Sequence, residues 1–240
     1  MSSLLEVDGL TKQYGGLQAV SQLKFSVGEG EIVGLIGPNG AGKTTTFNLL
    51  TGFETPTAGS IRFRGKQIAG LRPDQICQLG IARTFQIVKP LKRLPVLENV
   101  MVGAFCRHWD RRRARAIAEQ EVAFVGLQDR AYQNSANLTL SNRKRLELAR
   151  ALATGPSLLL LDEVMAGLNP TETEAAVDLL RRIHARGISM ILIEHVMRVV
   201  MSLSQRVVVL VQGQCLVVGD PATVAVDPRV TAAYLGAPRA

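Results

Sequence analysis

The chain has 240 residues, of which 47% are hydrophobic and 20% are charged, and its formal net charge is +8 at pH 7. This length and composition suit one large globular domain, or a core that carries an inserted subdomain. No apolar stretch reaches the roughly 18 residues of a membrane-spanning helix, and no basic region followed by an apolar signal segment opens the sequence. We therefore expect a soluble, cytoplasmic protein.

Cysteine usage and the distribution of charge narrow the possible classes of protein further. Cys77, Cys106 and Cys215 are odd in number, far apart and without a C-x-x-C pair, so we expect small buried hydrophobic side chains rather than disulfides or zinc ligands. Most of the net positive charge lies in residues 107–115 and 143–145. Aromatic residues are sparse and no nucleic-acid-binding module appears, so we expect a solvated helix face, or a contact with membrane headgroups or an acidic partner surface, and no nucleic-acid partner.

The first half of the chain is rich in predicted strands, and one of them leads into a phosphate-binding loop. Apolar runs predict strands at Leu4–Leu10, Glu31–Ile36 and Ile61–Phe63. The nine residues after the second strand match the P-loop pattern, in which glycines let the backbone turn sharply and approach phosphates closely. They are Gly37, Pro38, Asn39, Gly40, Ala41, Gly42, Lys43, Thr44 and Thr45.

Each polar residue of this loop has a chemical reason to be there. Lys43 places a positive charge at the β- and γ-phosphates, and Thr44 offers a hydroxyl to Mg²⁺. Thr45 and Thr46 open a predicted helix, whose N-terminal dipole favours an anion. The loop therefore predicts binding of a nucleoside triphosphate with Mg²⁺.

The middle of the chain changes from strand to helix. Residues 80–85 predict a strand that ends just before Gln86, an amide that can reach Mg²⁺ or the attacking water. From about Leu97 to Ala153 apolar residues recur at helical spacing. We expect a single domain over 1–240, with a core of 1–89 and 156–240 and an inserted helical subdomain at 90–155. The apolar positions of the expected insert are Ala114, Ile117, Ala118, Val122, Val125, Leu146, Ala149 and Ala153.

The last third predicts strands that end in catalytic side chains. Leu158–Leu161 runs directly into Asp162 and Glu163, which is a Walker B pattern: Asp162 holds Mg²⁺ and Glu163 polarises the attacking water. The strand at Ile188–Ile193 leads in the same way to His195, which is suited to orient that water or sense the γ-phosphate. Apolar runs separated by helices favour a buried parallel sheet covered on both faces. The other elements expected here are the helix Thr171–Ala185 and the strands Val207–Val211 and Leu216–Val218.

In this order the residues resemble the ATP-binding subunits of ABC transporters, over nearly the whole chain. Tyr14 precedes the P-loop where that family places an aromatic ring on adenine, Gln86 matches the Q-loop, and His195 matches the switch histidine. The resemblance implies an α/β P-loop NTPase: a RecA-like parallel sheet, an antiparallel β subdomain and an inserted α-helical subdomain. Five segments narrow the resemblance to the branched-chain amino acid importers, and one of them, 166–170, matches the D-loop. The other four are 80–86, 96–100, 193–195 and 233–236.

The resemblance also implies cofactors, partners and roles. ATP and Mg²⁺ bind between two such subunits that close head to tail, and closure drives integral-membrane permease subunits that receive substrate from a binding protein. The subunit then lies on the inner face of the cell membrane, held there through the permeases. Lys43, Gln86, Glu163 and His195 would serve catalysis, and Thr44, Gln86 and Asp162 would hold the metal.

The signature sequence departs from the family. The family motif, LSGGQ or LSYGQ, falls on Leu138–Asn142, where Thr139, Ser141 and Asn142 would contact the nucleotide of the partner subunit. Ser141 replaces a glycine, so we expect crowding of the phosphate and loss of a glycine-only backbone conformation. ATP should bind normally, yet turnover by a homodimer should be weak unless a partner subunit supplies an intact signature. Two smaller departures are Val164 in place of proline and Val196 in place of an acid.

Several functions stay open at this point. The chain can energise an importer of branched-chain or related hydrophobic amino acids, a urea or amide importer, or a lipopolysaccharide-type exporter. Alternatively it is a nucleotide-binding regulatory module with little turnover, or a soluble ABC protein of translation or DNA repair. The run 81–86 favours the importer, and this chain has neither the second cassette nor the long coiled-coil insert of the soluble types. ABC ATPases do not touch the transported substrate, so its identity lies outside this sequence.

Overall fold

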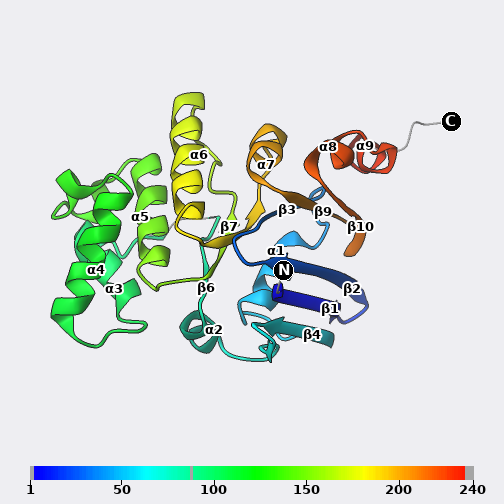
Figure 1. The fold of residues 1–240 in the computed structure, drawn as a ribbon, viewed down its shortest axis with the longest axis horizontal. Coiled ribbons are helices and arrows are strands. Elements are labelled where there is room, and N and C mark those ends of the chain that lie inside the picture. Colours follow the sequence, from blue (N-terminus) through cyan, green and yellow to red (C-terminus); the bar gives the residue numbers. More distant parts are fainter. Residues whose placement is uncertain (1–2, 87–88, 236–240) are drawn as a thin grey trace. The chain divides into compact units, whose positions relative to one another are not determined.

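The computed structural model describes residues 3–86 and 89–235 and divides into two compact units (Figure 1). The first unit consists of Met1–Pro73 with Gly187–Ala240, and the second of Asp74–Arg186. In the described part of the chain, no helix combines the length and the apolar character needed to cross a bilayer.

The first unit contains an antiparallel sheet built from the N-terminal quarter of the chain. Its strands are β1 (Ser3–Tyr14), β2 (Leu17–Gly28), β4 (Ala58–Phe63) and β5 (Lys66–Gln67), in the order β2-β1-β4-β5. The long strands bury alternate residues, as a sheet with one solvent-facing side does. The expected strands Leu4–Leu10 and Ile61–Phe63 are confirmed, and β2 is a strand that the apolar pattern did not reveal.

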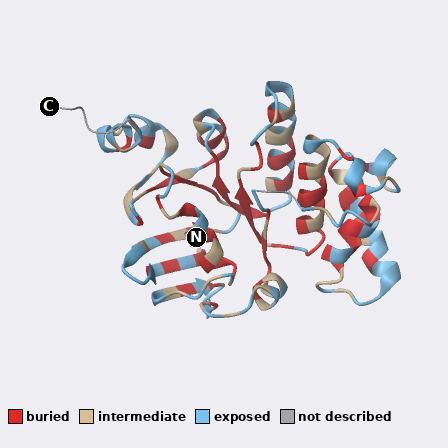
Figure 2. Ribbon diagram, turned by 180° about the vertical axis from the view of Figure 1, so that it is seen from behind, coloured by how far each residue is buried: buried red, intermediate tan, exposed pale blue. Residues whose placement is uncertain are grey.

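The same unit contains parallel strands whose residues are buried throughout. β3 (Ile32–Ile36) pairs in parallel with β8 (Ser189–Ile193) on one side and β9 (Arg206–Val211) on the other. Every residue of β3 and β8 is buried, and Figure 2 shows these strands as a continuous red core. Helix α1 (Lys43–Leu50) follows β3, and α7 (Met197–Leu203), α8 (Pro221–Ala225) and α9 (Pro228–Leu235) follow the later strands. The expectation of buried parallel strands is confirmed here.

The last expected strand, Leu216–Val218, is confirmed and pairs antiparallel with its neighbour. β10 (Gln214–Gly219) folds back on β9 through the two residues Gln212 and Gly213. Both have positive φ, 49° and 79°, which is the backbone of a tight hairpin turn whose twist matches that of the strands. No helix separates the two apolar runs, so the chain returns directly and a parallel crossover has no room to form.

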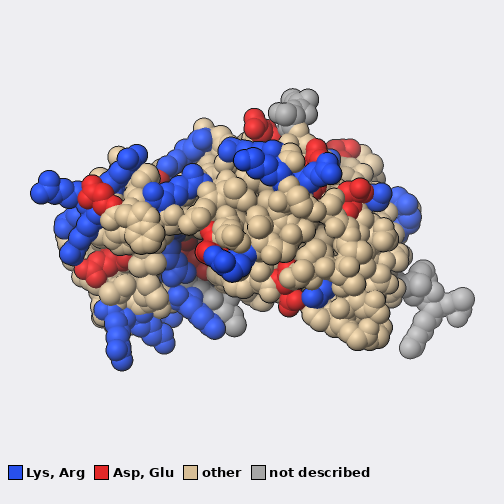
Figure 3. All heavy atoms as spheres, turned by 90° about the horizontal axis from the view of Figure 1, so that it is seen from below, with Lys and Arg blue, Asp and Glu red and all other residues tan. Residues whose placement is uncertain are grey.

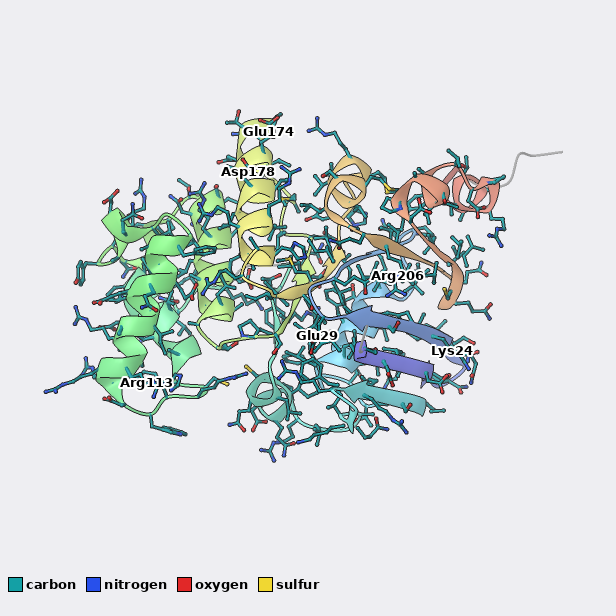
Figure 4. The ribbon with its side chains drawn as sticks, viewed as in Figure 1. Lys24, Glu29, Arg113, Glu174, Asp178 and Arg206 are labelled. Carbon is teal, nitrogen blue, oxygen red and sulfur yellow. The ribbon has the colours of Figure 1, made fainter. Side chains whose placement is uncertain are left out.

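An ion pair holds the start of β9 against the turn before β3. Arg206, labelled in Figure 4, donates from Nε and Nη2 to the two carboxylate oxygens of Glu31, both at 2.9 Å. Its Nη2 also donates to the carbonyl of Ser26 at 2.7 Å. A bidentate, partly buried pair of this kind fixes geometry as well as adding energy, so it sets where β9 begins.

The second unit is mainly helical and contains one pair of parallel strands. β6 (Ile81–Arg83) pairs with β7 (Leu158–Asp162), and the helices are α2 (Pro73–Leu79), α3 (Val96–Ala104), α4 (Arg111–Phe124), α5 (Leu140–Leu152) and α6 (Pro170–His184). Two short 3₁₀ turns, Gln128–Arg130 and Ser135–Asn137, join α4 to α5. The apolar stripe expected on these helices is buried except at Ile117, which is half-buried.

Side-chain caps explain where three of these helices begin. Asp110 accepts from the amide of Arg112 at the start of α4, and Thr139 accepts from the amide of Asn142 at the start of α5. α6 has a complete capping box, in which Asn169 and Glu172 accept from each other's backbone, and Pro170 stands at its first turn. The α/β class is confirmed. The boundaries expected for the helical insert, 90 and 155, stay a prediction.

The close approach of α3 and α5 generates a stability prediction. A Cβ built on Gly103 of α3 would lie 2.2 Å from the carbonyl oxygen of Arg150, so Gly103→Ala must push the two helices apart. We expect a loss of about 1–3 kcal/mol in the free energy of unfolding, despite the better helix propensity of alanine. Val102→Ala, at a neighbouring exposed position of the same helix, should change it by less than about 0.5 kcal/mol. Equal denaturation midpoints for the two variants would contradict this packing argument.

Candidate functional site

The P-loop joins β3 to α1, and its backbone requires glycine at two positions. Gly37 has φ +153° and Gly42 has φ +98°. A Cβ on Gly37 would lie 2.1 Å from the carbonyl oxygen of Leu210, and one on Gly42 would lie 2.5 Å from that of Ala19. Asn39 and Gly40 are exposed at the tip of the loop. The loop is therefore fixed on both sides by neighbouring backbone, with its tip open to solvent.

The charge of the loop is concentrated on Lys43. Its side chain is buried, and Nζ donates to the carbonyls of Gly37 and Pro38 at 2.7 and 3.0 Å. Thr44 is exposed and Thr45 is half-buried in the first turn of α1. Free amides at a helix start, together with an ammonium group held beside them, make a site for an anion such as a phosphate.

The hairpin turn between β9 and β10 supports the P-loop, and the sequence did not reveal this role. Gly213 donates its amide to the carbonyl of Ala41 at 3.1 Å, and its carbonyl accepts from the amide of Ser21 at 2.8 Å. A Cβ on Gly213 would meet the carbonyl of Ala19 at 2.8 Å. The only signal in the sequence was a glycine between two apolar runs, which predicts a turn but not the loop that the turn touches.

Tyr14 lies at the end of β1, where its ring is 42% exposed. Its hydroxyl bonds to the carboxylate of Glu54, and Lys12 Nζ lies 4.8 Å from the ring centroid and 3.0 Å from Glu54. Burial, and after it the Glu54 charge, raise the pKa of Tyr14, so the phenol stays neutral. The ring is thus anchored at its hydroxyl while part of its surface is open for stacking.

His195 emerges at the same edge of the parallel sheet as the P-loop. β8 runs parallel to β3, with Leu192 opposite Gly34, so the residues that follow each strand leave the sheet on the same side. His195 is exposed, whereas the preceding Glu194 is buried. The first unit therefore brings together the P-loop and the predicted switch histidine at one sheet edge, and it also carries Tyr14.

The second unit brings together the predicted catalytic acid and the predicted Q-loop amide. β6 and β7 are parallel, with Arg83 opposite Leu160, so Gln86 and the acids after β7 share an edge. Gln86 Nε2 donates to Glu163 Oε2 at 2.7 Å. These two side chains come from positions 77 residues apart, and the register of the two strands makes their contact possible.

Asp162 is buried beside an arginine that the sequence analysis did not assign. Arg83 Nη2 lies 2.7 Å from Asp162 Oδ2, and the two side chains are only 7% and 4% exposed. The guanidinium also lies over the ring of Phe85, at 5.1 Å from its centroid. Because a buried carboxylate without a counter-charge is costly, Arg83 supplies that counter-charge and fixes the carboxylate of Asp162 in position.

Glu163 has a strained backbone. Its φ is +50°, in the left-handed region that a residue with a side chain enters at a cost of about 1–3 kcal/mol. Two donors hold its carbonyl: the amide of Ala166 at 3.1 Å and the ammonium of Lys144, a buried residue of α5, at 3.0 Å. The helix that follows the signature segment is therefore bonded to the backbone of the predicted catalytic acid.

Glu147 on α5 is a second residue that the sequence did not reveal. Its buried carboxylate accepts from the amide of Phe85 at 2.9 Å, directly before Gln86. Burial raises the pKa of Glu147, and the bond from Phe85 and the charges of Arg150 and Lys144 act against that shift. The available signal was a carboxylate within the apolar stripe of α5, which pointed to a buried polar contact without naming its partner.

Asn99 fixes the segment that precedes α3. The residue is fully buried, and its Nδ2 donates to the carbonyls of Leu91, Leu94 and Pro95, while Oδ1 accepts from the amide of Leu91. One amide group thus satisfies four backbone groups of a short turn. Asn99, which lies in the segment 96–100, therefore fixes the conformation of the chain before α3.

The signature segment forms a regular helix start, which corrects one expectation. Leu138 is buried, Thr139 caps α5, and its Oγ1 accepts from the amide of Asn142 at 3.4 Å. Ser141 is helical and is absent from the described residues other than glycine that have positive φ. The position therefore does not need a glycine-only conformation, because Thr139 rather than residue 141 makes the turn into the helix. The crowding expected from the Ser141 side chain stays a prediction.

The two smaller departures lie at turns after β7 and β8. Val164 is buried directly after Glu163, and Val196 stands at the first turn of α7. Val196 has no side-chain acceptor, so α7 begins without a side-chain cap.

The basic segment forms the exposed start of α4. Trp109 is 89% exposed, and Arg111, Arg112 and Arg113 project from the first turn. Figure 3 shows lysine and arginine gathered at the end of the molecule where α3 and α4 lie, and Figure 4 labels Arg113 there. The described part of this segment is a solvated helix face, as expected, and its partner stays a prediction.

Comparisons with known proteins agree with these features. Residues 20–166 match the family described as ABC transporter. The chain is 41% identical to the high-affinity branched-chain amino acid transport ATP-binding protein BraF of Pseudomonas aeruginosa, over 97% of this chain and 98% of that protein. It has the same identity and the same two coverages with LivG of Escherichia coli, which has the same description. A nucleotide-free ATP-binding cassette from an ABC transporter superposes with a TM-score of 0.89 at 28% identity, covering 98% of this chain and 100% of that one.

The Arg83–Asp162 pair generates a second stability prediction. Arg83→Met leaves a buried carboxylate without its counter-charge, so we expect a loss of about 3–5 kcal/mol in the free energy of unfolding by chemical denaturation. Adding Asp162→Asn should recover most of that loss. The exposed pair of Arg115 and Glu119 is the matched control, because Arg115→Met should cost less than about 1 kcal/mol. Similar losses for the two methionine variants would show that burial does not govern the Arg83 pair.

Proposed function

Because the chain belongs to the ABC transporter family, which confirms the resemblance found in its motifs, we propose that it energises an importer of branched-chain or related hydrophobic amino acids. Members of this family bind and hydrolyse ATP, and relatives that match over nearly their whole length are named as branched-chain amino acid transport ATP-binding proteins. Identity of 41% with these subunits supports the assignment to importers rather than exporters.

The observation that carries the hydrolytic part of this function is the 2.7 Å hydrogen bond between Gln86 and Glu163. A general base must be held in one orientation and next to a group that can sense the substrate. The amide orients the carboxylate, and the carbonyl bonds of Glu163 fix its backbone. In this role Glu163 takes a proton from water as the water attacks the γ-phosphate.

The other site residues have complementary roles in this proposal. Lys43 and the amides of residues 37–45 bind the phosphates, Tyr14 stacks on adenine, and His195 orients the attacking water. Thr139, Ser141 and Asn142 face the nucleotide bound by a second subunit. These roles follow from the family resemblance and from the placement of each side chain at a strand end or helix start.

Mg²⁺ fits the residues that this chain offers. A threonine hydroxyl, an amide oxygen and a carboxylate are the hard oxygen ligands that Mg²⁺ prefers, and Thr44, Gln86 and Asp162 supply them. The carboxylate of Asp162 has two oxygens, and Arg83 contacts Oδ2. We therefore assign the other oxygen, Oδ1, to the metal. When bound with ATP, the metal would neutralise charge on the β- and γ-phosphates.

Partners and location complete the proposal. Two ATP-binding subunits would close around two nucleotides, as a homodimer or a heterodimer, and would act on integral-membrane permeases fed by a substrate-binding protein. The helical segment 90–155 is the proposed permease contact, which would keep the subunit at the inner face of the membrane. Weak turnover remains an alternative for a homodimer, because Ser141 presents a side chain where the family has glycine.

A test of the hydrolytic role uses Glu163→Gln. The amide keeps the shape of the side chain but cannot take a proton, so we expect the steady-state ATPase rate to fall by about 100-fold or more. ATP affinity, measured by titration calorimetry, should stay close to that of wild type. Glu174→Gln, on the exposed face of α6, is the control and should retain full activity. An ATPase rate that survives Glu163→Gln would remove Glu163 from the role of base.

The effect of the signature is tested by Ser141→Gly. Removing the side chain should raise the ATPase rate of the isolated chain severalfold, because less bulk faces the phosphate across the dimer. Ser141→Ala keeps Cβ and removes the hydroxyl, so an intermediate rate would show that side-chain size is the cause. No rise with Ser141→Gly, together with a wild-type rate already usual for the family, would eliminate weak turnover as a property of this signature.

A further inference from the structure

Two cysteines that are far apart in sequence lie side by side in the second unit. Cys77 is in α2 and Cys106 is in the turn after α3, yet Cys106 Sγ donates to Cys77 Sγ at 3.4 Å. Both thiols are free and half-buried, rather than fully buried as the sequence suggested. The third cysteine, Cys215, is half-buried on β10 in the other unit.

Hydrogen bonds fix the backbone turn beside each of the two cysteines. The carbonyl of Cys77 accepts from the amide of Gly80, and the amide of Cys106 donates to the carbonyl of Gly103. A Cβ on Gly80 would lie 3.3 Å from Arg107 Nη2, so the side chain next to Cys106 covers the turn that follows α2. The approach of the sulfurs is therefore part of a packed contact between two backbone turns.

We propose that Cys77 and Cys106 are a reversible oxidation site, where a peroxide converts the two thiols into a disulfide that joins α2 to the end of α3. A disulfide needs an S–S distance of about 2.05 Å. The sulfurs must therefore approach by roughly 1.4 Å from their present 3.4 Å.

The chemistry balances with one peroxide molecule for each disulfide. Burial, and after it the bond to Cys106, raise the pKa of Cys77 to about 12, so its thiol stays protonated at neutral pH. The Cys106 sulfur attacks the peroxide, the O–O bond breaks, and a sulfenic acid and water form. The Cys77 sulfur then attacks Cys106, the S–O bond breaks, and hydroxide leaves with the Cys77 proton as a second water. A thiol reductant reverses the reaction.

The disulfide would enclose the segment that carries Gln86. The chain runs from Cys77 through β6 to Gln86, and then through the turn held by Asn99 and α3 to Cys106. A covalent bond at this point would restrict movement of α2 relative to the end of α3 more strongly than the thiol contact does. If Gln86 must move between Glu163 and the nucleotide during turnover, oxidation slows hydrolysis. This consequence rests on the proposed function, but the disulfide itself does not.

The disulfide is tested on the full chain by mass spectrometry. The protein is treated with increasing hydrogen peroxide, its remaining thiols are alkylated, and it is digested without reduction. We expect a linked peptide that contains Cys77 and Cys106, alkylated Cys215, and loss of the linked peptide after dithiothreitol. Cys215→Ser should leave the link intact, while Cys77→Ser and Cys106→Ser should each abolish it. Alkylation of Cys77 and Cys106 to the same extent as Cys215 at every peroxide concentration would overturn the proposal.

The effect on Gln86 is tested by activity on the same samples. Oxidation should lower the ATPase rate of wild type by about fivefold, a usual size for coupling between two sites, and dithiothreitol should restore it. Cys77→Ser and Cys106→Ser should keep their rates under peroxide. A linked peptide with an unchanged ATPase rate would overturn the restraint on Gln86. A reduced protein without ATPase activity would count against the proposed function, and the peptide result would still decide whether the thiol site exists.

Discussion

Parallel pairing between neighbouring strands is the constraint on which the functional geometry depends. Because β3 and β8 run in the same direction, the P-loop and His195 leave the sheet on one side. The pairing of β6 with β7 does the same for Gln86 and Glu163, whose side chains meet at 2.7 Å. A slip of one residue in either register would turn these side chains to the opposite face.

The candidate site residues that lie in contiguous segments could be located from the sequence, whereas contacts between distant segments could not. The P-loop and the pair Asp162–Glu163 are read from a few adjacent residues, because a strand followed by a polar turn is a local pattern. Arg83, Glu147 and Gly213 act through partners far along the chain: 79 residues separate Arg83 from Asp162, and 62 separate Glu147 from Phe85. The spacing of apolar residues along the sequence does not encode such pairings. They cannot be located until the pairing register of the strands is known.

Two features depend on the backbone conformation of a single turn. Positive φ at Gln212 and Gly213 makes β10 return beside β9. At the signature, Thr139 makes the turn into α5, so Ser141 needs no special backbone. Any effect of Ser141 must therefore arise from the contacts of its side chain, because the helix that carries it begins with regular geometry.

The left-handed backbone of Glu163 places stability and chemistry in opposition. A glycine at this position would release the strain. Selection for thermal stability alone would therefore favour residues that tolerate positive φ at position 163. The carbonyl bonds from Lys144 and Ala166 offset part of the strain without removing it. This strain accompanies the proposed role of Glu163 as the base that acts on the attacking water, a role that positive φ does not by itself assign, because Gln22, Arg64 and Gln212 share it. A substitution at position 163 that relieves the positive φ would therefore raise the stability of the fold and lower the rate of ATP hydrolysis.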